Sequence, residues 1–119
     1  VNREVQITLP SGRVLYYRDC KVGADGALRY SEGKLWGGVI TENIDQAISR
    51  DLSCWWTLKC EDAGLPVVLT VHDEDVTMLK IETAEADLKV QADIMCSLPD
   101  WAEGLPVDVD ARLSPCYCK

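Results

Sequence analysis

An apolar run that ends in three polar residues constrains this chain more than any other feature. Residues 66–71, Pro-Val-Val-Leu-Thr-Val, are followed at once by His-Asp-Glu at 72–74. A short run that is rich in β-branched residues and opened by proline is typical of a buried strand. A second β-forming run, 76–81, begins after Asp75. The two runs predict a tight antiparallel hairpin with three carboxylates at or near its tip.

The three carboxylates of this hairpin suggest a bound cation. Asp73, Glu74 and Asp75 are consecutive, and their repulsion costs stability unless a positive charge lies among them. A divalent cation with oxygen ligands would remove that cost. A solvated acidic turn is the alternative, and a run of three acidic residues taken alone favours it.

The stretch from Thr41 to Gly64 predicts one long helix. Thr41 can cap its start, and Gly64 followed by Pro66 can end it. Residues on one side recur at helical spacing and form a core-facing stripe with one acidic member. The stripe consists of Ile44, Ala47, Ile48, Asp51, Leu52, Trp55 and Leu58.

The other side of this helix carries a narrow arc of polar residues. The arc consists of Asn43, Gln46, Arg50, Ser53 and Thr57. Such groups can donate hydrogen bonds to minor-groove acceptors, whose pattern hardly depends on base sequence. An ordinary solvent-exposed face is the alternative, and the arc taken alone favours it.

Shorter elements surround these two. The sequence predicts a hairpin of residues 5–9 and 14–17, a short strand at 28–30, a second helix at 83–98 and a final edge strand at 105–109. The expected fold is therefore α/β of the α+β kind, with an antiparallel sheet packed against one long and one shorter helix. No linker or repeat divides the chain, so residues 1–119 are expected to form a single domain.

Composition narrows the class of protein. The net charge of −8 argues against general phosphate-backbone binding by this chain alone, but it suits an acidic metal-binding surface. The six cysteines include no Cys-x-x-Cys pair, and His72 is the only histidine, so zinc-ligand spacing is absent. We find no signal peptide and no membrane-spanning run. Buried free thiols in a cytoplasmic protein are expected.

Four stretches together resemble one enzyme family. Residues 71–74 are similar to the last palm motif of family A DNA polymerases, the DNA polymerase I type, and residues 42–52 resemble the long palm helix of the same enzymes. Residues 33–38 and 9–17 resemble the phage branch of that family. The chain is thus identified, by resemblance, as the C-terminal part of a polymerase palm.

The resemblance implies template-dependent nucleotidyl transfer to a primer 3′-hydroxyl. That reaction uses two Mg²⁺ ions roughly 4 Å apart, held by carboxylates. By resemblance Asp73 is the metal ligand, and Glu74 assists it or binds metal weakly. His72 would contact the primer end.

The same resemblance assigns DNA contacts to the long helix. Gln46, Asn43 and Arg50 would bind primer–template DNA together with His72. The spacing between Asn43 and Gln46 departs slightly from that of bacterial members, so Asn43 is the weaker assignment.

The resemblance is incomplete in ways that matter for activity. The family's other metal-binding aspartate, in an Asp-x-Ser-Gln-x-Glu motif, is absent, as are the fingers helix that binds deoxynucleoside triphosphates and the thumb. The two-ion site is therefore incomplete, and the isolated chain is expected to be inactive without the missing N-terminal part of the polymerase. Half a palm exposes apolar surface, so a homodimer of the fragment is a further expectation.

Two substitutions keep a different interpretation open. Asp75 stands where the family has an aliphatic residue, and Met78 stands where an acidic one is common. A non-catalytic remnant or module, which packs against a partner or binds nucleic acid weakly, is the alternative. An unrelated acidic metal-binding domain is the third.

Overall fold

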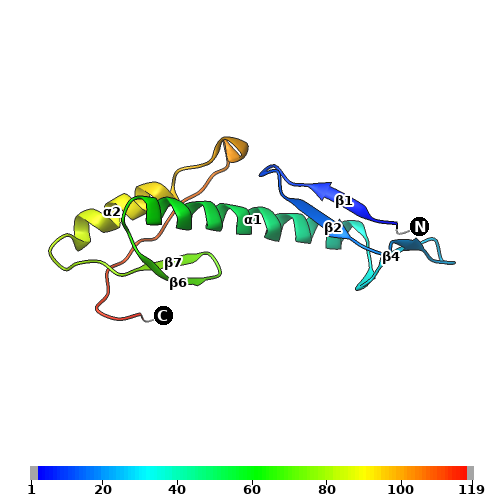
Figure 1. The fold of residues 1–119 in the computed structure, drawn as a ribbon, viewed down its shortest axis with the longest axis horizontal. Helices are drawn as coiled ribbons and strands as arrows, with labels where there is room; N and C mark the ends of the chain where they lie inside the picture. Colours follow the sequence, from blue (N-terminus) through cyan, green and yellow to red (C-terminus); the bar gives the residue numbers. More distant parts are fainter. Residues whose placement is uncertain (1–2, 118–119) are drawn as a thin grey trace. The chain divides into compact units, whose positions relative to one another are not determined.

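The computed structural model describes residues 3–117 and confirms the α+β class, with two α-helices and antiparallel strands. The chain divides into two compact units, Val1–Arg50 and Asp51–Lys119, and the long helix contributes to both (Figure 1). The strands form three separate small sheets in place of one. A single domain over residues 1–119 stays a prediction. Within residues 3–117, neither helix is long and apolar enough to cross a membrane.

The long helix, α1 (Gly37–Asp62), starts four residues earlier than the sequence indicates. Thr41, the expected cap, lies inside it, where its hydroxyl donates a hydrogen bond of 2.9 Å to the carbonyl of Gly37. A threonine inside a helix satisfies its hydroxyl in this way, so it does not mark the start. The end is as predicted, because Gly64 adopts a left-handed φ of 78°.

The first unit contains two small antiparallel sheets. These are the hairpin β1 (Val5–Thr8) and β2 (Val14–Tyr17), and the sheet of β3 (Lys21–Val22), β4 (Leu28–Tyr30) and β5 (Gly33–Lys34). The hairpin and the strand at 28–30 confirm the sequence predictions. Tyr17, Cys20 and Leu35 form the buried core, and the ring of Tyr30 meets that of Tyr17 edge-on at 5.4 Å.

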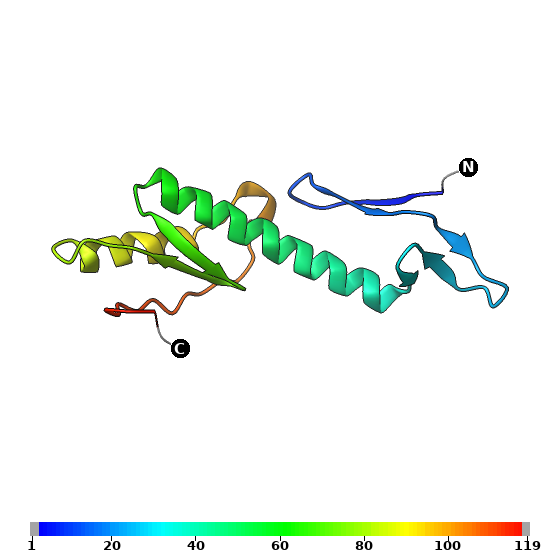
Figure 2. The same ribbon diagram turned by 60° about the horizontal axis from the view of Figure 1, so that its bottom comes forward.

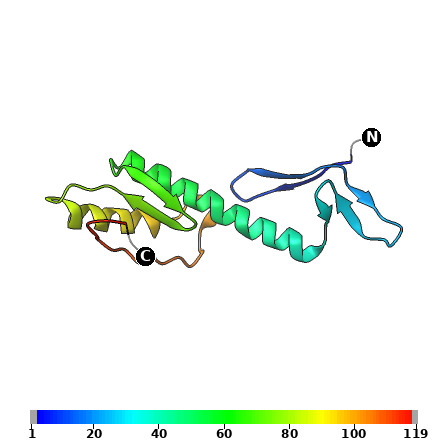
Figure 3. The same ribbon diagram turned by 90° about the horizontal axis from the view of Figure 1, so that it is seen from below.

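The second unit places one hairpin beside two helices. The hairpin consists of β6 (Val67–Val71) and β7 (Glu74–Thr77), and it lies alongside α2 (Ala84–Met95) and the C-terminal part of α1 (Figures 2 and 3). A 3₁₀ turn follows at Asp100–Ala102. The shorter helix of the prediction is therefore confirmed, with a C-terminal end three residues earlier.

Two strand predictions in this unit are wrong. The strand expected at 76–81 lies at 74–77, because the turn takes only two residues and pairing resumes at once. The strand expected at 105–109 is irregular. Pro106 has no N–H to donate, and no strand among residues 3–117 pairs with this segment.

The buried side of the helix and hairpin also differs from expectation. Leu58, predicted to face the core, is 65% exposed, whereas Cys60 is fully buried. In β6, predicted as a buried strand, Val68 is 53% and Leu69 is 41% exposed. Within residues 3–117, β6 pairs only with β7, and the elements beside this hairpin leave both side chains partly uncovered.

The cysteines follow the same division between core and surface. Those in residues 3–117 are free thiols. Burial is confirmed for Cys20 and Cys60 and is wrong for Cys54, Cys96 and Cys116, which are exposed. Cys118 lies outside the described residues.

Candidate functional site

The predicted hairpin exists, and His72 and Asp73 form its two-residue turn. Val71 pairs with Glu74 across the last rung, so the turn follows immediately. His72 has a φ of 55°, a left-handed conformation that is uncommon for a residue with a side chain. The side chains of residues 72–74 are exposed, and the structure therefore presents His-Asp-Glu at one end of the hairpin.

The third carboxylate of the acidic run has different surroundings. Asp75 lies in β7 and is half-buried. The hydroxyl of Thr57, on α1, lies 3.0 and 3.2 Å from the two carboxylate oxygens of Asp75. Asp73 and Asp75 therefore do not share one exposed acidic tip, although the sequence brings them together.

A glutamine that the sequence analysis did not single out completes these contacts. Gln91, on α2, is 6% exposed. Its amide N–H donates to the carbonyl of Asp75 at 3.2 Å, and its amide oxygen accepts a hydrogen bond of 2.7 Å from the hydroxyl of Thr77. A signal was present, because Gln91 falls on the helical stripe formed by Leu88, Ala92 and Met95.

The thiol of Cys60 lies in the interior of the second unit. Burial raises the pKa of Cys60 to about 11, and the negative charges of Asp75 and Glu61 add to the shift. The charge of Asp75 therefore acts on a buried residue of α1. A thiol with this pKa is neutral at pH 7 and takes the part of a small apolar side chain.

The chain's C-terminal segment reaches the candidate site. The Tyr117 hydroxyl donates a hydrogen bond of 3.2 Å to the carboxylate of Glu74. Partial burial raises the pKa of Tyr117, and the charge of Glu74 adds to that effect. No local pattern indicates this contact, because it joins residues 43 positions apart.

A metal centre is not complete within the described residues. Residues 3–117 contain no group of three or more His, Cys, Asp or Glu side chains placed to hold a metal ion. Asp73 and Glu74 are exposed carboxylates of the right chemistry for Mg²⁺.

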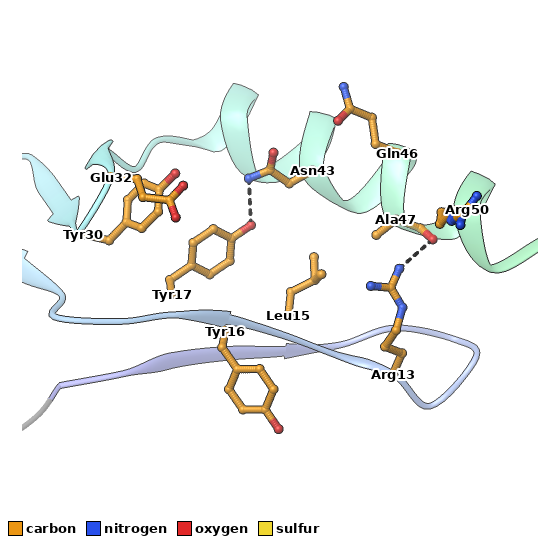
Figure 4. Close-up of a pocket in the computed structure, with 10 residues that line it drawn as sticks. All are labelled: Arg13, Leu15, Tyr16, Tyr17, Tyr30, Glu32, Asn43, Gln46, Ala47 and Arg50. Atoms are coloured by element: carbon orange, nitrogen blue, oxygen red, sulfur yellow. Dashed lines mark hydrogen bonds between the residues drawn. The ribbon is translucent and has the colours of Figure 1, made fainter. Parts of the chain in front are cut away.

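The predicted DNA-contacting residues of α1 line one groove of the first unit (Figure 4). The groove has a volume of about 430 Å³ and lies between β2 and the helix. Its lining residues are Arg13, Leu15, Tyr16, Tyr17, Tyr30, Glu32, Asn43, Gln46, Ala47 and Arg50. The lining contains two arginines and one glutamate, in a chain whose net charge is −8.

The three predicted contacts differ in how they are held. Asn43 is half-buried, and its amide donates a hydrogen bond of 3.0 Å to the hydroxyl of Tyr17. Gln46 is exposed and bonds Glu42 one turn earlier at 3.1 Å. Arg50 is exposed. All three residues therefore line one groove, and the amide of Asn43 is also used in a hydrogen bond within the unit.

Arg13 is a groove residue that sequence reasoning missed. Its guanidinium donates a hydrogen bond of 2.9 Å to the carbonyl of Ala47, which lies one turn before Arg50 on α1 (Figure 4). The β1–β2 hairpin thereby contributes a second guanidinium to the groove. Only the long-range pairing of hairpin and helix reveals it, because Arg13 lies 34 positions from Ala47.

One protein of known activity resembles the chain along nearly its whole length. The DNA polymerase of Bacillus phage SP02 is 38% identical over an alignment of 128 positions, gaps included, which takes in 95% of this chain and 19% of that protein. This chain is related to a phage DNA polymerase. It spans about a fifth of its relative's length. No protein-family model matches the chain, and no solved structure matches it.

This relationship covers both the hairpin and the groove. Because the match takes in 95% of the chain, it is not confined to one short motif. The family A assignment, the palm and the individual site residues stay predictions.

Proposed function

We propose that this chain is part of a family A DNA-directed DNA polymerase and forms the C-terminal portion of its palm. The observation that carries the proposal is the 38% identity to a phage DNA polymerase over 95% of the chain. The exposed His-Asp-Glu turn supports it, because the reaction needs carboxylates that a primer end and a nucleotide can reach.

In this proposal the hairpin turn contributes to the reaction centre. Asp73 and Glu74 would hold Mg²⁺ together with carboxylates from another part of the polymerase. The bound ions would supply electrostatic stabilisation of the transferring phosphoryl group. His72 would contact the primer end, and its left-handed backbone aims the turn that carries Asp73. Tyr117 would restrict the motion of the Glu74 carboxylate through its hydrogen bond.

Side chains at the groove of the first unit would contact the primer–template duplex. Gln46 and Asn43 carry amide groups that can bond minor-groove acceptors of any base pair. Arg50 would contact the phosphate backbone, since an exposed guanidinium suits that role. Sequence-independent contacts of this kind suit an enzyme that must hold every correctly paired primer end.

The rest of the polymerase is the partner that the exposed surface of β6 implies. Val68 and Leu69 belong to an apolar strand, yet about half of each side chain is exposed. A relative about five times as long as this chain contains ample sequence to cover them. Without that cover, the same surface would drive pairing of two copies of this chain.

The alternative is a non-catalytic module that packs against a partner or binds nucleic acid weakly. The specific observation that favours it is the absence, within residues 3–117, of three grouped metal-ligating side chains. In the polymerase proposal the same observation means that the chain alone is inactive.

Primer extension separates the two proposals. The larger polymerase that carries this chain and the 119-residue chain alone are each incubated with primed template, four deoxynucleotides and Mg²⁺. We expect template-dependent extension by the larger protein and none by the chain. Extension by the chain alone would contradict its inactivity, and a failure of both would favour the non-catalytic module.

A further inference from the structure

Asp75 is an acidic residue for which the proposed function has no use. It stands in β7, two positions after Asp73, where the resemblance leads to an aliphatic side chain. Its carboxylate instead meets the hydroxyl of Thr57 at 3.0 and 3.2 Å. That hydroxyl also lies 2.9 Å from the carbonyl of Ser53, within α1. Asp75 therefore links β7 to α1.

Gln91 links the same strand to α2. Its side-chain amide bonds the backbone of Asp75 with its N–H and the hydroxyl of Thr77 with its oxygen. One amide therefore contacts two positions of β7, the main chain of Asp75 and the side chain of Thr77. The side chain is 6% exposed, and both of its ends have partners.

These contacts matter because the hairpin has little support of its own. A two-stranded sheet is at best marginally stable in water, so the position of its turn depends on what it packs against. A slip of one residue would exchange the two faces of β7 and break both amide contacts. Apolar packing alone tolerates small displacements better, since hydrogen bonds weaken steeply with angle and distance.

We propose that Gln91 is a positioning residue that, with Thr57 and Asp75, holds β7 between α1 and α2 and so fixes the turn of His72 and Asp73. A role of these three residues in catalysis rests on the proposed function. In this proposal Asp75 replaces the family's aliphatic residue and has polar partners in the fold. The substitution therefore does not indicate a non-catalytic remnant.

The first test measures the hairpin in the full 119-residue chain by hydrogen exchange. Gln91→Leu removes both amide contacts and keeps the side chain's size. Leu88→Ala, one turn earlier on α2, is the control, because it weakens the packing of the helix and leaves the amide contacts intact. We expect Gln91→Leu to speed exchange of the amides at residues 71–75 about tenfold more than the control does, since local opening governs exchange. Equal acceleration by both variants would overturn the proposal.

The second test uses single-turnover nucleotide incorporation by the larger polymerase. Gln91→Leu is expected to lower the maximal rate about tenfold or more, because a small misplacement of a reacting group is costly, while the Kd for DNA stays unchanged. Gln91→Glu keeps the acceptor for Thr77 and loses the donor to Asp75, so an intermediate rate is expected. Leu88→Ala should incorporate at nearly the normal rate even where its loss of Tm equals that of Gln91→Leu. Rates that follow Tm in all three variants would contradict a positioning role.

The two tests distinguish a failure of this inference from a failure of the proposed function. Suppose that Asp73→Asn leaves incorporation unchanged in the same polymerase. The polymerase role of the turn then falls, and the exchange measurement still decides whether Gln91 holds the hairpin.

Discussion

At the residue scale, Asp73 and Asp75 show how neighbours in sequence acquire different chemistry. Asp73 lies in the exposed turn, where a bound cation or substrate can reach it. Asp75 faces inward, and Thr57 and Gln91 bond its side chain and its backbone carbonyl. The cause is that Asp73 belongs to the two-residue turn, whereas Asp75 belongs to the paired strand β7. The functional importance of an acidic run thus depends on which member the turn exposes.

The environment of Cys60 leads to a prediction on thiol reactivity. Burial and the charges of Asp75 and Glu61 raise its pKa to about 11 from an ordinary value of 9.0. At pH 8, iodoacetamide should therefore modify exposed Cys54 and Cys96 while Cys60 stays unmodified in the folded chain. Peptide mass spectrometry after a timed reaction gives the rates. Modification of Cys60 as fast as of Cys54 would mean that the second unit is not packed as described.

The sign of the pH effect follows from the same shift. A raised folded-state pKa favours the neutral thiol, so this contribution to stability is complete below pH 9 and is lost as the pH rises toward 11. Cys60→Ala should therefore flatten the fall in Tm between pH 9 and 11. An unchanged slope in that variant would remove Cys60 as the cause.

At the scale of elements, local patterns predict those parts that local forces determine. The helix over α1 and the hairpin of β6 and β7 follow from helical spacing, β-branched residues and the glycine at position 64. Burial did not follow, because it depends on which long-range neighbour covers each face. Leu58 is exposed and Gln91 is buried for that reason. The segment 105–109 has strand-forming residues but no partner edge among residues 3–117, so composition alone misled.

The candidate site divides in the same way. His72, Asp73 and Glu74 could be named from sequence because three consecutive residues carry the motif. Arg13, Gln91 and Tyr117 could not be placed without the fold, since each contacts residues far away along the chain.

Gly64 supplies a stability prediction for the end of α1. Its φ of 78° is left-handed, and a Cβ added there would meet no atom within 4 Å. Gly64→Ala should therefore destabilise the chain by about 1 kcal/mol through backbone conformation alone. Chemical denaturation measures the change, with Gly37→Ala as the control at a position that also has open space but no positive φ. Equal stability of the two variants would contradict the described helix end.

At the scale of the whole molecule, charge is distributed unevenly. The chain has a net charge of −8, yet two arginines and one glutamate line the groove of the first unit. An acidic chain gains little from general attraction to DNA, so contact depends on a few placed cations. The exposed acidic turn lies in the second unit, so the net charge of the whole chain conceals this difference between the units.

Arg50 gives this distribution a measurable consequence. In the larger polymerase, Arg50→Ala should weaken primer–template binding and lower the slope of log Kd against log salt by about one, as expected for a lost phosphate contact. Lys89→Ala, an exposed lysine on α2, is the matched control and should leave the slope unchanged. Identical slopes for Arg50→Ala and the unmodified protein would exclude Arg50 from the DNA contact.

The central claim is that the turn of the β6–β7 hairpin belongs to a polymerase reaction centre. Asp73→Asn keeps the shape and hydrogen bonding of the side chain and removes its charge, and Asp75→Asn does the same two residues later. In single-turnover incorporation by the larger polymerase, we expect Asp73→Asn to lose a hundredfold or more in rate, about 3 kcal/mol of transition-state stabilisation. Asp75→Asn should lose far less, because an amide oxygen can still accept from Thr57, and both variants should bind DNA normally. Near-normal incorporation by Asp73→Asn would mean that His-Asp-Glu is only a solvated acidic turn. That result would contradict the polymerase role of this site.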